Sequence, residues 1–272
     1  MGSRQTDRLH GRMAAVTGAS SGIGLCFCRT LAEQGCDLLM ISNQRDELQA
    51  CAAEIEAEHG VRAVPYYCDL TSEGATDEIM EYIDRTGLDP DILINNAGIF
   101  SFMPVIETHE RKLDCFIDLH VRAVTKLSRA FADRMARRGG GNILNMSSMS
   151  CWMPMPGLAM YASTKAYIRV FTRSLHYEMR DSGVAVTVAC PGGIATDLFG
   201  LPENLKRLAV RLHAIQTPEK FTRRAVDKML RGRKQYINGW LNRVAIVFVA
   251  AMPTSVRMLV KHRMLDKNIT RP

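Results

Sequence analysis

The chain has 272 residues, of which 47% are hydrophobic and 23% are charged, with 10 Pro and 20 Gly. This composition excludes a disordered, collagen-like or disulfide-scaffold chain. The length fits one α/β unit or two small domains, and no internal repeat or low-complexity linker divides the sequence. We therefore expect a single domain with a sizeable core.

Cysteine usage and hydropathy indicate the cellular compartment. Eight cysteines are scattered singly, without a CxxC pair or the spacing of zinc ligands. The opening residues MGSRQTDR lead into no apolar segment of a signal peptide. The longest apolar run, 244–252, has nine residues, whereas a bilayer span needs about 20. We expect a cytoplasmic protein with free thiols, no bound metal and no transmembrane helix.

Charge is distributed unevenly along the chain. Residues 1–200 hold 19 Lys and Arg against 24 Asp and Glu, whereas residues 201–272 hold 16 against 4. A strongly basic C-terminal quarter thus follows an acidic body. Such a segment is either a solvated surface or a contact for phosphates, anionic lipid or an acidic partner. We expect no nucleic-acid partner.

Six short apolar runs, bounded by Gly, Asp or Asn, alternate with stretches in which apolar and charged residues recur three and four apart. The runs have strand length and lie at 13–17, 37–41, 62–67, 91–95, 142–146 and 184–189. The stretches between them, at 22–35, 45–59, 72–86, 108–138 and 160–181, have the pattern of helices. This order predicts a Rossmann-like α/β fold with a doubly wound parallel sheet. Ligands of such sheets bind beyond the carboxyl ends of the strands.

A glycine-rich turn follows the first apolar run. It reads TGASSGIG over residues 17–24 and opens a helix. Its glycines let the backbone approach a phosphate, and the helix N-terminus offers free N–H groups and a partial positive charge. The spacing differs from GxGxxG, so a glycine-rich turn without a ligand is the alternative interpretation.

Three further motifs follow in order: NNAG at 95–98, Ser148 together with YASTK at 161–165, and PGGIAT at 191–196. With the glycine-rich turn, this series resembles the short-chain dehydrogenase/reductase family over about residues 11–198. The resemblance implies an oxidoreductase that uses a nicotinamide dinucleotide. It leaves the last 70 or so residues without family features.

The candidate catalytic residues are Ser148, Tyr161 and Lys165. Tyr161 and Lys165 are four residues apart and so share a helix face. A phenol has a reference pKa of about 10, and a neighbouring ammonium favours the phenolate, so Lys165 makes Tyr161 a usable general acid or base. Ser148 can hold the substrate oxygen by a hydrogen bond. A surface Tyr–Lys pair and a strand-end Ser are the structural alternative.

The same resemblance implies a set of cofactor contacts. It implies that Lys165 binds the nicotinamide ribose and that the Ile194 backbone and Thr196 bind the carboxamide. It further implies that Asn96 lies on the adenosine ribose side and that Asp69 contacts the adenine. Asp69 is otherwise explained as a charge at a helix N-terminus. The full predicted cofactor set is Gly18, Ser20, Ser21, Gly22, Ile23, Gly24, Asn43, Arg45, Asp69, Asn96, Tyr161, Lys165, Ile194 and Thr196.

Two positions bear on the cofactor type and on proton transfer. NAD enzymes place a carboxylate after the second strand, but this chain reads Ser-Asn-Gln-Arg over 42–45, so Arg45 and Asn43 favour NADP(H) over NAD(H). Against this, Ser21 stands where many NADP-using relatives have Lys or Arg. His120 occupies a position at which the family usually has Asn; it either holds a water, shuttles a proton near its reference pKa of about 6.5, or fills a helix bend.

The pattern divides the chain into a dinucleotide-binding catalytic domain, 11–238, and a basic, partly apolar extension, 239–272. Residues 198–216 are expected to form a substrate lid, and the leucines there, at spacings of three and four, give an apolar stripe of the kind that mostly serves packing. In the extension, Trp240 and the 244–252 run lie among cations, which suits peripheral membrane contact, a strand and helix completing the sheet, or a subunit contact equally.

The expected function is interconversion of a ketone and a secondary alcohol on a lipophilic substrate, such as a 3-ketoacyl lipid, 3-ketosphinganine or a hydroxysteroid, by a homo-oligomer. The alternatives are a reductase of carrier-bound 3-ketoacyl chains, with the basic surface receiving an acidic carrier protein, and a non-catalytic dinucleotide-binding protein.

Overall fold

The computed structural model describes residues 9–194 and 216–265. Within these residues seven strands form one parallel sheet in the order β3-β2-β1-β4-β5-β6-β7. The strands are β1 Met13–Thr17, β2 Asp37–Ser42, β3 Ala63–Tyr67, β4 Ile92–Asn95, β5 Gly141–Met146, β6 Val184–Ala189 and β7 Gln235–Tyr236. The predicted Rossmann-like fold is confirmed, and all six predicted strands are present with ends shifted by at most one residue.

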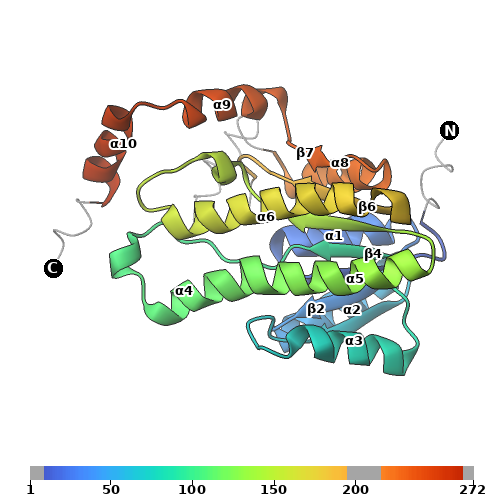
Figure 1. Cartoon of the computed structure of the whole chain (residues 1–272). Helices are drawn as coiled ribbons and strands as arrows, with labels where there is room; N and C mark the ends of the chain where they lie inside the picture. The colour runs from blue at the N-terminus through green and yellow to red at the C-terminus, as the bar shows by residue number, and fades with distance from the viewer. Residues whose placement is uncertain (1–8, 195–215, 266–272) are drawn as a thin grey trace.

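Helices cover both faces of this sheet (Figure 1). They are α1 Gly22–Ala32, α2 Arg45–His59, α3 Ala75–Thr86, α4 Glu110–Ile117, α5 Val124–Arg137, α6 Ala159–Glu178 and α8 Pro218–Leu230. The stretch 108–138, expected as one helix, is divided by a π-helical segment, Asp118–Ala123. That segment contains His120, which makes it relevant to the site described below.

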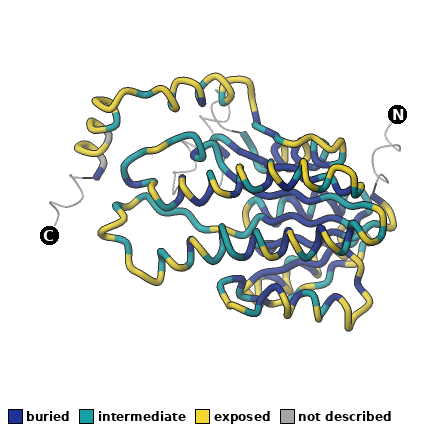
Figure 2. Tube along the Cα trace, viewed as in Figure 1, coloured by how far each residue is buried: buried dark blue, intermediate teal, exposed yellow. Residues whose placement is uncertain are grey.

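The core explains why the strands are nearly continuous apolar runs. One core cluster packs α1 and α8 against the sheet through Phe27 and Phe221, and a second packs α3 and α5 through Ile79 and Phe131. All four side chains are fully buried, and Figure 2 shows the burial concentrated along the strands. Because both faces of a parallel sheet are covered, its strands alternate little between apolar and polar residues.

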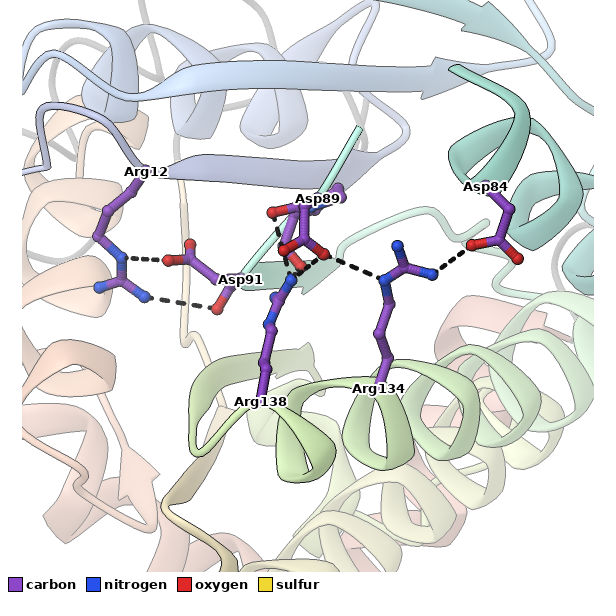
Figure 3. Close-up of polar contacts among 7 residues, drawn as sticks. Arg12, Asp84, Asp89, Asp91, Arg134 and Arg138 are labelled. Carbon is purple, nitrogen blue, oxygen red and sulfur yellow. Dashed lines mark hydrogen bonds and ion pairs between the residues drawn. The ribbon is translucent and has the colours of Figure 1, made fainter. Parts of the chain in front are cut away.

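Ion pairs fasten the amino-terminal edge of the sheet, opposite the carboxyl ends of the strands (Figure 3). Arg12 precedes β1 and binds Asp91, which precedes β4, with 2.9 Å between Nε and Oδ2. Arg134 and Arg138, at the end of α5, both bind Asp89. Half-exposed pairs of this kind contribute about 0–1 kcal/mol each, so they mainly fix the strand ends relative to α5.

Among the described residues of the C-terminal segment, α9 Trp240–Ala250 and α10 Thr254–Val260, followed by a π-helical segment, Lys261–Leu265, arch away from the body (Figure 1). The strand that completes the sheet, β7, precedes this segment, and α9 packs beside the short helix η3, Met149–Trp152. Trp240 is 71% exposed and Phe248 is 72% exposed. Among the described helices none alone has the length and hydropathy of a membrane span, whereas α9 and the helix after it meet that test only as a sharply bent pair.

Candidate active site

A cavity of about 700 Å³ opens at the carboxyl ends of the strands, where β1 and β4 are neighbours and the chain order of the sheet reverses. This is the position at which doubly wound sheets bind ligands. The cavity wall contains residues from the turn after β1, the segments after β2, β3, β4, β5 and β6, and helix α6. Polar residues that line it include Gly18, Ser20, Ser21, Gly22, Asn43, Gln44, Asp69, Thr71, Asn96, Ser148, Tyr161 and Lys165.

The glycine-rich turn is shaped for close backbone approach. Gly18 and Gly22 have φ values of +66° and +54°, a region that side chains with a Cβ rarely adopt. Gly24 does not line the cavity, because it packs under the turn: a Cβ there would lie 1.9 Å from the Gly18 carbonyl oxygen. Ser21 makes no side-chain capping hydrogen bond at the start of α1, which leaves the first N–H groups of the helix available to an anion.

The segment after β2 binds to this turn through hydroxyl and amide groups. Ser20 donates to Gln44 Oε1 at 2.8 Å, and the Ser20 and Ser42 hydroxyls are also 2.8 Å apart. Asn43 lines the cavity as expected. Arg45, by contrast, is exposed and lies over the Tyr67 ring, with its guanidinium carbon 4.3 Å from the ring centroid, outside the lining residues.

Asn96 and Asp69 are both held in fixed positions at the cavity wall. The Asn96 side chain donates to the Thr17 carbonyl at 3.1 Å, so it joins the end of β1 to the loop after β4. Asp69 Oδ1 accepts from the backbone and hydroxyl of Thr71, at 3.0 and 2.8 Å. Asp69 therefore both faces the cavity and stabilises a turn before α3, so the two interpretations of its role are compatible.

The three candidate catalytic residues meet at one end of the cavity. Ser148 follows β5, accepts from the Ser150 N–H at 3.1 Å, and lies close enough to Tyr161 to act against the rise that burial causes in the pKa of its phenol. Lys165 Nζ donates to the Met146 carbonyl at 3.0 Å and lies 5.7 Å from the centroid of the Tyr161 ring. Phe100 packs edge-on against that ring with the centroids 5.0 Å apart, which restricts the phenol to its orientation.

Buried polar contacts fix α6, the helix that carries Tyr161 and Lys165, on the sheet. Ser147 donates its hydroxyl to the Lys165 carbonyl at 2.7 Å. Two turns further, Asn145 donates to the Thr172 hydroxyl at 3.0 Å. Because Asn145 and Ser147 lie at the end of β5, these contacts set the distance between that strand and the two candidate catalytic residues of α6.

Burial has opposite effects on the two titratable groups. It lowers the pKa of Lys165 to about 8, because the charged form loses its hydration. It raises the pKa of Tyr161, and the hydrogen bond from Ser148 only partly opposes this rise. The sequence predicted that Lys165 favours the phenolate; in this structure burial outweighs any such effect. A neutral phenol is therefore the form of Tyr161 that is ready to donate a proton.

His120 lies behind these residues, fully buried in the π-helical segment. Its Nε2 accepts from the Ile99 N–H at 3.2 Å, and its Nδ1 lies 2.9 Å from the Thr164 hydroxyl. An accepting Nε2 places the hydrogen on Nδ1, so the neutral ring donates to Thr164, which donates to a carbonyl of α6. Burial, and next Lys165, lower the pKa of His120 well below 6.5, which disfavours proton shuttling by the ring near its reference pKa.

Two predictions fall partly or wholly outside the described residues. Thr196 and nearly all of the proposed lid, 198–216, belong to the undescribed range 195–215. Ile194 is described; it lines the cavity and pairs with Gln216 in an isolated bridge.

Sequence reasoning missed several lining residues. Gln44 was not selected, although it lies between Asn43 and Arg45, which were; it lines the cavity and its side chain accepts from Ser20. Cys115 and Leu119 come from α4 and the π-helical segment after it and reach the cavity through the packing of those turns against the loop after β4. No local motif marks such positions.

The sequence model of the short chain dehydrogenase family matches residues 12–204. The chain is 29% identical over 255 residues to a very-long-chain 3-oxoacyl-CoA reductase of Anas platyrhynchos, covering 91% of this chain and 78% of that protein. It is 33% identical over 194 residues to 17-beta-hydroxysteroid dehydrogenase type 3 of Mus musculus, covering 70% and 63%. A short-chain dehydrogenase from Sphingobium yanoikuyae, solved in complex with NADPH, has a TM-score of 0.76 and 26% identity, covering 93% and 96%.

Proposed function

Because the chain belongs to the short-chain dehydrogenase family, an oxidoreductase class, we propose that it reduces a ketone on a lipophilic molecule, or oxidises the corresponding secondary alcohol, with NADP(H) as the preferred cofactor. The observation that carries this proposal is the contact of Tyr161 with Ser148 beside Lys165 in a cavity that also contains the glycine-rich turn. The candidate proton donor and the glycine-rich turn thus line the same cavity.

The residues of the cavity fit a nicotinamide dinucleotide. Gly18 leaves no room for a Cβ, which would lie 3.0 Å from the Ala97 backbone, so the turn packs closely against the loop after β4. The uncapped start of α1 suits a pyrophosphate, Asp69 the adenine, Asn96 the adenosine ribose, and Lys165 the nicotinamide ribose. When bound, the nicotinamide would supply or accept the hydride at the carbonyl carbon.

We assign the proton chemistry to the chain's own residues. Ser148 holds the substrate oxygen by a hydrogen bond, and Tyr161 donates its phenolic proton to that oxygen as negative charge develops on it. Lys165 then stabilises the phenolate, because its ammonium lies beside the ring, and assists its reprotonation. In the direction of oxidation the same groups act in reverse, with the Tyr161 phenolate as the base.

The NADP(H) preference is supported by the segment after β2, which carries no carboxylate that would repel a 2′-phosphate. Ser42, Asn43 and Gln44 line the cavity there. Arg45 lies next to them, stacked on Tyr67. We propose that Arg45 and Asn43 bind the 2′-phosphate. The similarity to a relative solved in complex with NADPH supports this proposal.

The proposed substrate class is supported by similarity to relatives named for 3-oxoacyl-CoA and hydroxysteroid chemistry. We propose a 3-ketoacyl lipid, 3-ketosphinganine or hydroxysteroid. The exposed apolar residues of α9, together with Arg243 and Arg257, support peripheral contact of the 239–272 extension with anionic membrane from the cytoplasmic side. We also propose a homo-oligomer, for which the exposed Val170 on α6 is one contact candidate.

The test is a turnover screen of the purified protein with NADPH and, separately, NADH. Oxidation of the cofactor is followed by absorbance against ketosteroids, 3-ketosphinganine, 3-ketoacyl-CoA and 3-ketoacyl carrier protein. Turnover with free lipids or CoA esters supports the proposal. Turnover confined to the carrier-bound chain favours the alternative enzyme, and dinucleotide binding without turnover on any ketone or alcohol favours a non-catalytic protein.

A further inference from the structure

Two cysteines meet directly behind the loop that carries Ser148. Cys151 lies in η3, three residues after Ser148, and Cys190 directly follows β6. The two chain segments are held together by a hydrogen bond from the Met149 N–H to the Pro191 carbonyl at 2.8 Å. The Cys151 and Cys190 side chains belong to the same small apolar cluster, and each thiol is the largest single influence on the pKa of the other.

The surroundings of the two thiols differ. Cys151 is half-buried, whereas Cys190 is fully buried. The Arg169 guanidinium packs over the Trp152 ring at 4.4 Å beside Cys151, and its buried Nε makes no hydrogen bond to any described residue. A positive group with an unsatisfied donor next to an accessible thiol stabilises a thiolate.

The pKa directions agree with this arrangement. The hydrogen bond from Cys190 is the largest cause that lowers the pKa of Cys151, with contributions from Ser147 and Arg169, and burial opposes it. The pKa of Cys190 is raised, first by its contact with Cys151 and then by burial. The other six cysteines of the chain, Cys26, Cys28, Cys36, Cys51, Cys68 and Cys115, all have raised pKa values, with burial as the largest cause.

We propose that Cys151 and Cys190 form an oxidation site that responds to hydrogen peroxide and, as a disulfide, slows the enzyme. The Cys151 thiolate attacks the peroxide, breaks its O–O bond and becomes a sulfenic acid, releasing hydroxide that takes up a proton as water. The Cys190 thiol then attacks the sulfenic sulfur, forming the S–S bond and releasing the second water. Two thiols and one peroxide thus give one disulfide and two waters.

The disulfide would strain the active site, a consequence that rests on the proposed function. The two sulfurs must come within about 2.05 Å of each other to bond, so at least one of the two segments moves. The η3 segment follows Ser148, and Cys190 precedes Pro191 and Gly192, which line the cavity. A displacement of about 1 Å at reacting groups can cost about 10²-fold in rate, so we expect a loss of that order on oxidation.

The experiment exposes the 272-residue protein to stoichiometric hydrogen peroxide and then blocks and counts the free thiols in denaturant. We expect the count to fall from eight to six, and peptide mass analysis to find Cys151 joined to Cys190. After peroxide treatment, Cys151→Ser should still have its remaining seven thiols and the turnover rate it had before treatment. Cys26→Ser, a control at a half-buried position on α1, should still form the disulfide. Cys151→Ala serves if the serine variant folds poorly.

Turnover is measured on the same samples before and after a thiol reductant. A reversible loss of about 10²-fold in wild type, absent in Cys151→Ser, is the expected result. An unchanged thiol count, a disulfide at another pair, or a Cys151–Cys190 bond with unchanged turnover would each overturn the proposal. The thiol count and the peptide masses need no substrate, so a failure of the proposed reductase activity is distinguished from a failure of the oxidation site.

Discussion

Replacing Gly24 by Ala tests whether the conformation of the glycine-rich turn depends on the close packing of Gly24 against Gly18 and Asn96. The added Cβ would lie 1.9 Å from the Gly18 carbonyl oxygen and 2.6 Å from Asn96 Nδ2, whereas real Cβ contacts under 3.0 Å are essentially absent. The turn or helix α1 must therefore move by about 1 Å, and overpacking of this kind costs typically 1–3 kcal/mol. The same movement shifts the N–H groups that we propose bind the cofactor phosphates, so we expect NADPH affinity to fall at least tenfold.

Denaturant unfolding gives the stability change, and NADPH fluorescence titration gives the affinity. Gly74→Ala is the matched control, since its Cβ meets nothing nearer than 3.5 Å and the position has an ordinary φ. The control should change the free energy of unfolding by less than about 1 kcal/mol and leave NADPH affinity unchanged. Wild-type stability and affinity in Gly24→Ala would refute the close packing of Gly18, Gly24 and Asn96 as the basis of the site.

Three further predictions concern charge. Arg45→Ala should weaken the binding of NADPH, but not of NADH, by about 1.5–3 kcal/mol or roughly 10–150-fold. Equal NADPH affinity of wild type and Arg45→Ala would show that Arg45 contacts only Tyr67 and not the cofactor. Because burial lowers the pKa of His120, the unfolded chain takes up a proton below about pH 6.5 that the folded protein does not. Stability should therefore fall as pH drops through that value, by up to about 1.4 kcal/mol per pH unit, and unfolding of His120→Gln should lack this slope. The protein should sediment with anionic vesicles at low salt and less at high salt, and Phe248→Ser should weaken this; sedimentation that is equal with neutral vesicles would contradict the charge argument.

The sheet could be predicted from the sequence because strands that are covered on both faces are mostly apolar, as in Ile92–Asn95 and Val184–Ala189. It did not reveal β7, which has only two residues, Gln235–Tyr236, and no pattern of its own. The division of 108–138 also escaped prediction, since a π-helical segment depends on which carbonyl each N–H finds rather than on residue spacing.

The candidate site could be predicted where a role depends on spacing along one element, as with Tyr161 and Lys165 on α6. The site could not be predicted where a residue's role depends on contacts between separate helices, strands or loops. Arg45 faces Tyr67 of a neighbouring strand, Gln44 accepts from Ser20, and Cys151 meets Cys190 across two loops. Such pairings are set by tertiary packing, so the sequence leaves them open.

The most direct test of the central claim is single-turnover reduction by Tyr161→Phe. NADPH affinity is measured on the same protein, with a ketone that the wild type accepts. The phenol donates the proton and contributes little to cofactor binding, so the rate should fall by about 10²–10⁴-fold while the affinity stays at the wild-type value. A Tyr161→Phe protein that keeps more than about a tenth of the wild-type rate would contradict the assignment of Tyr161 as the proton donor.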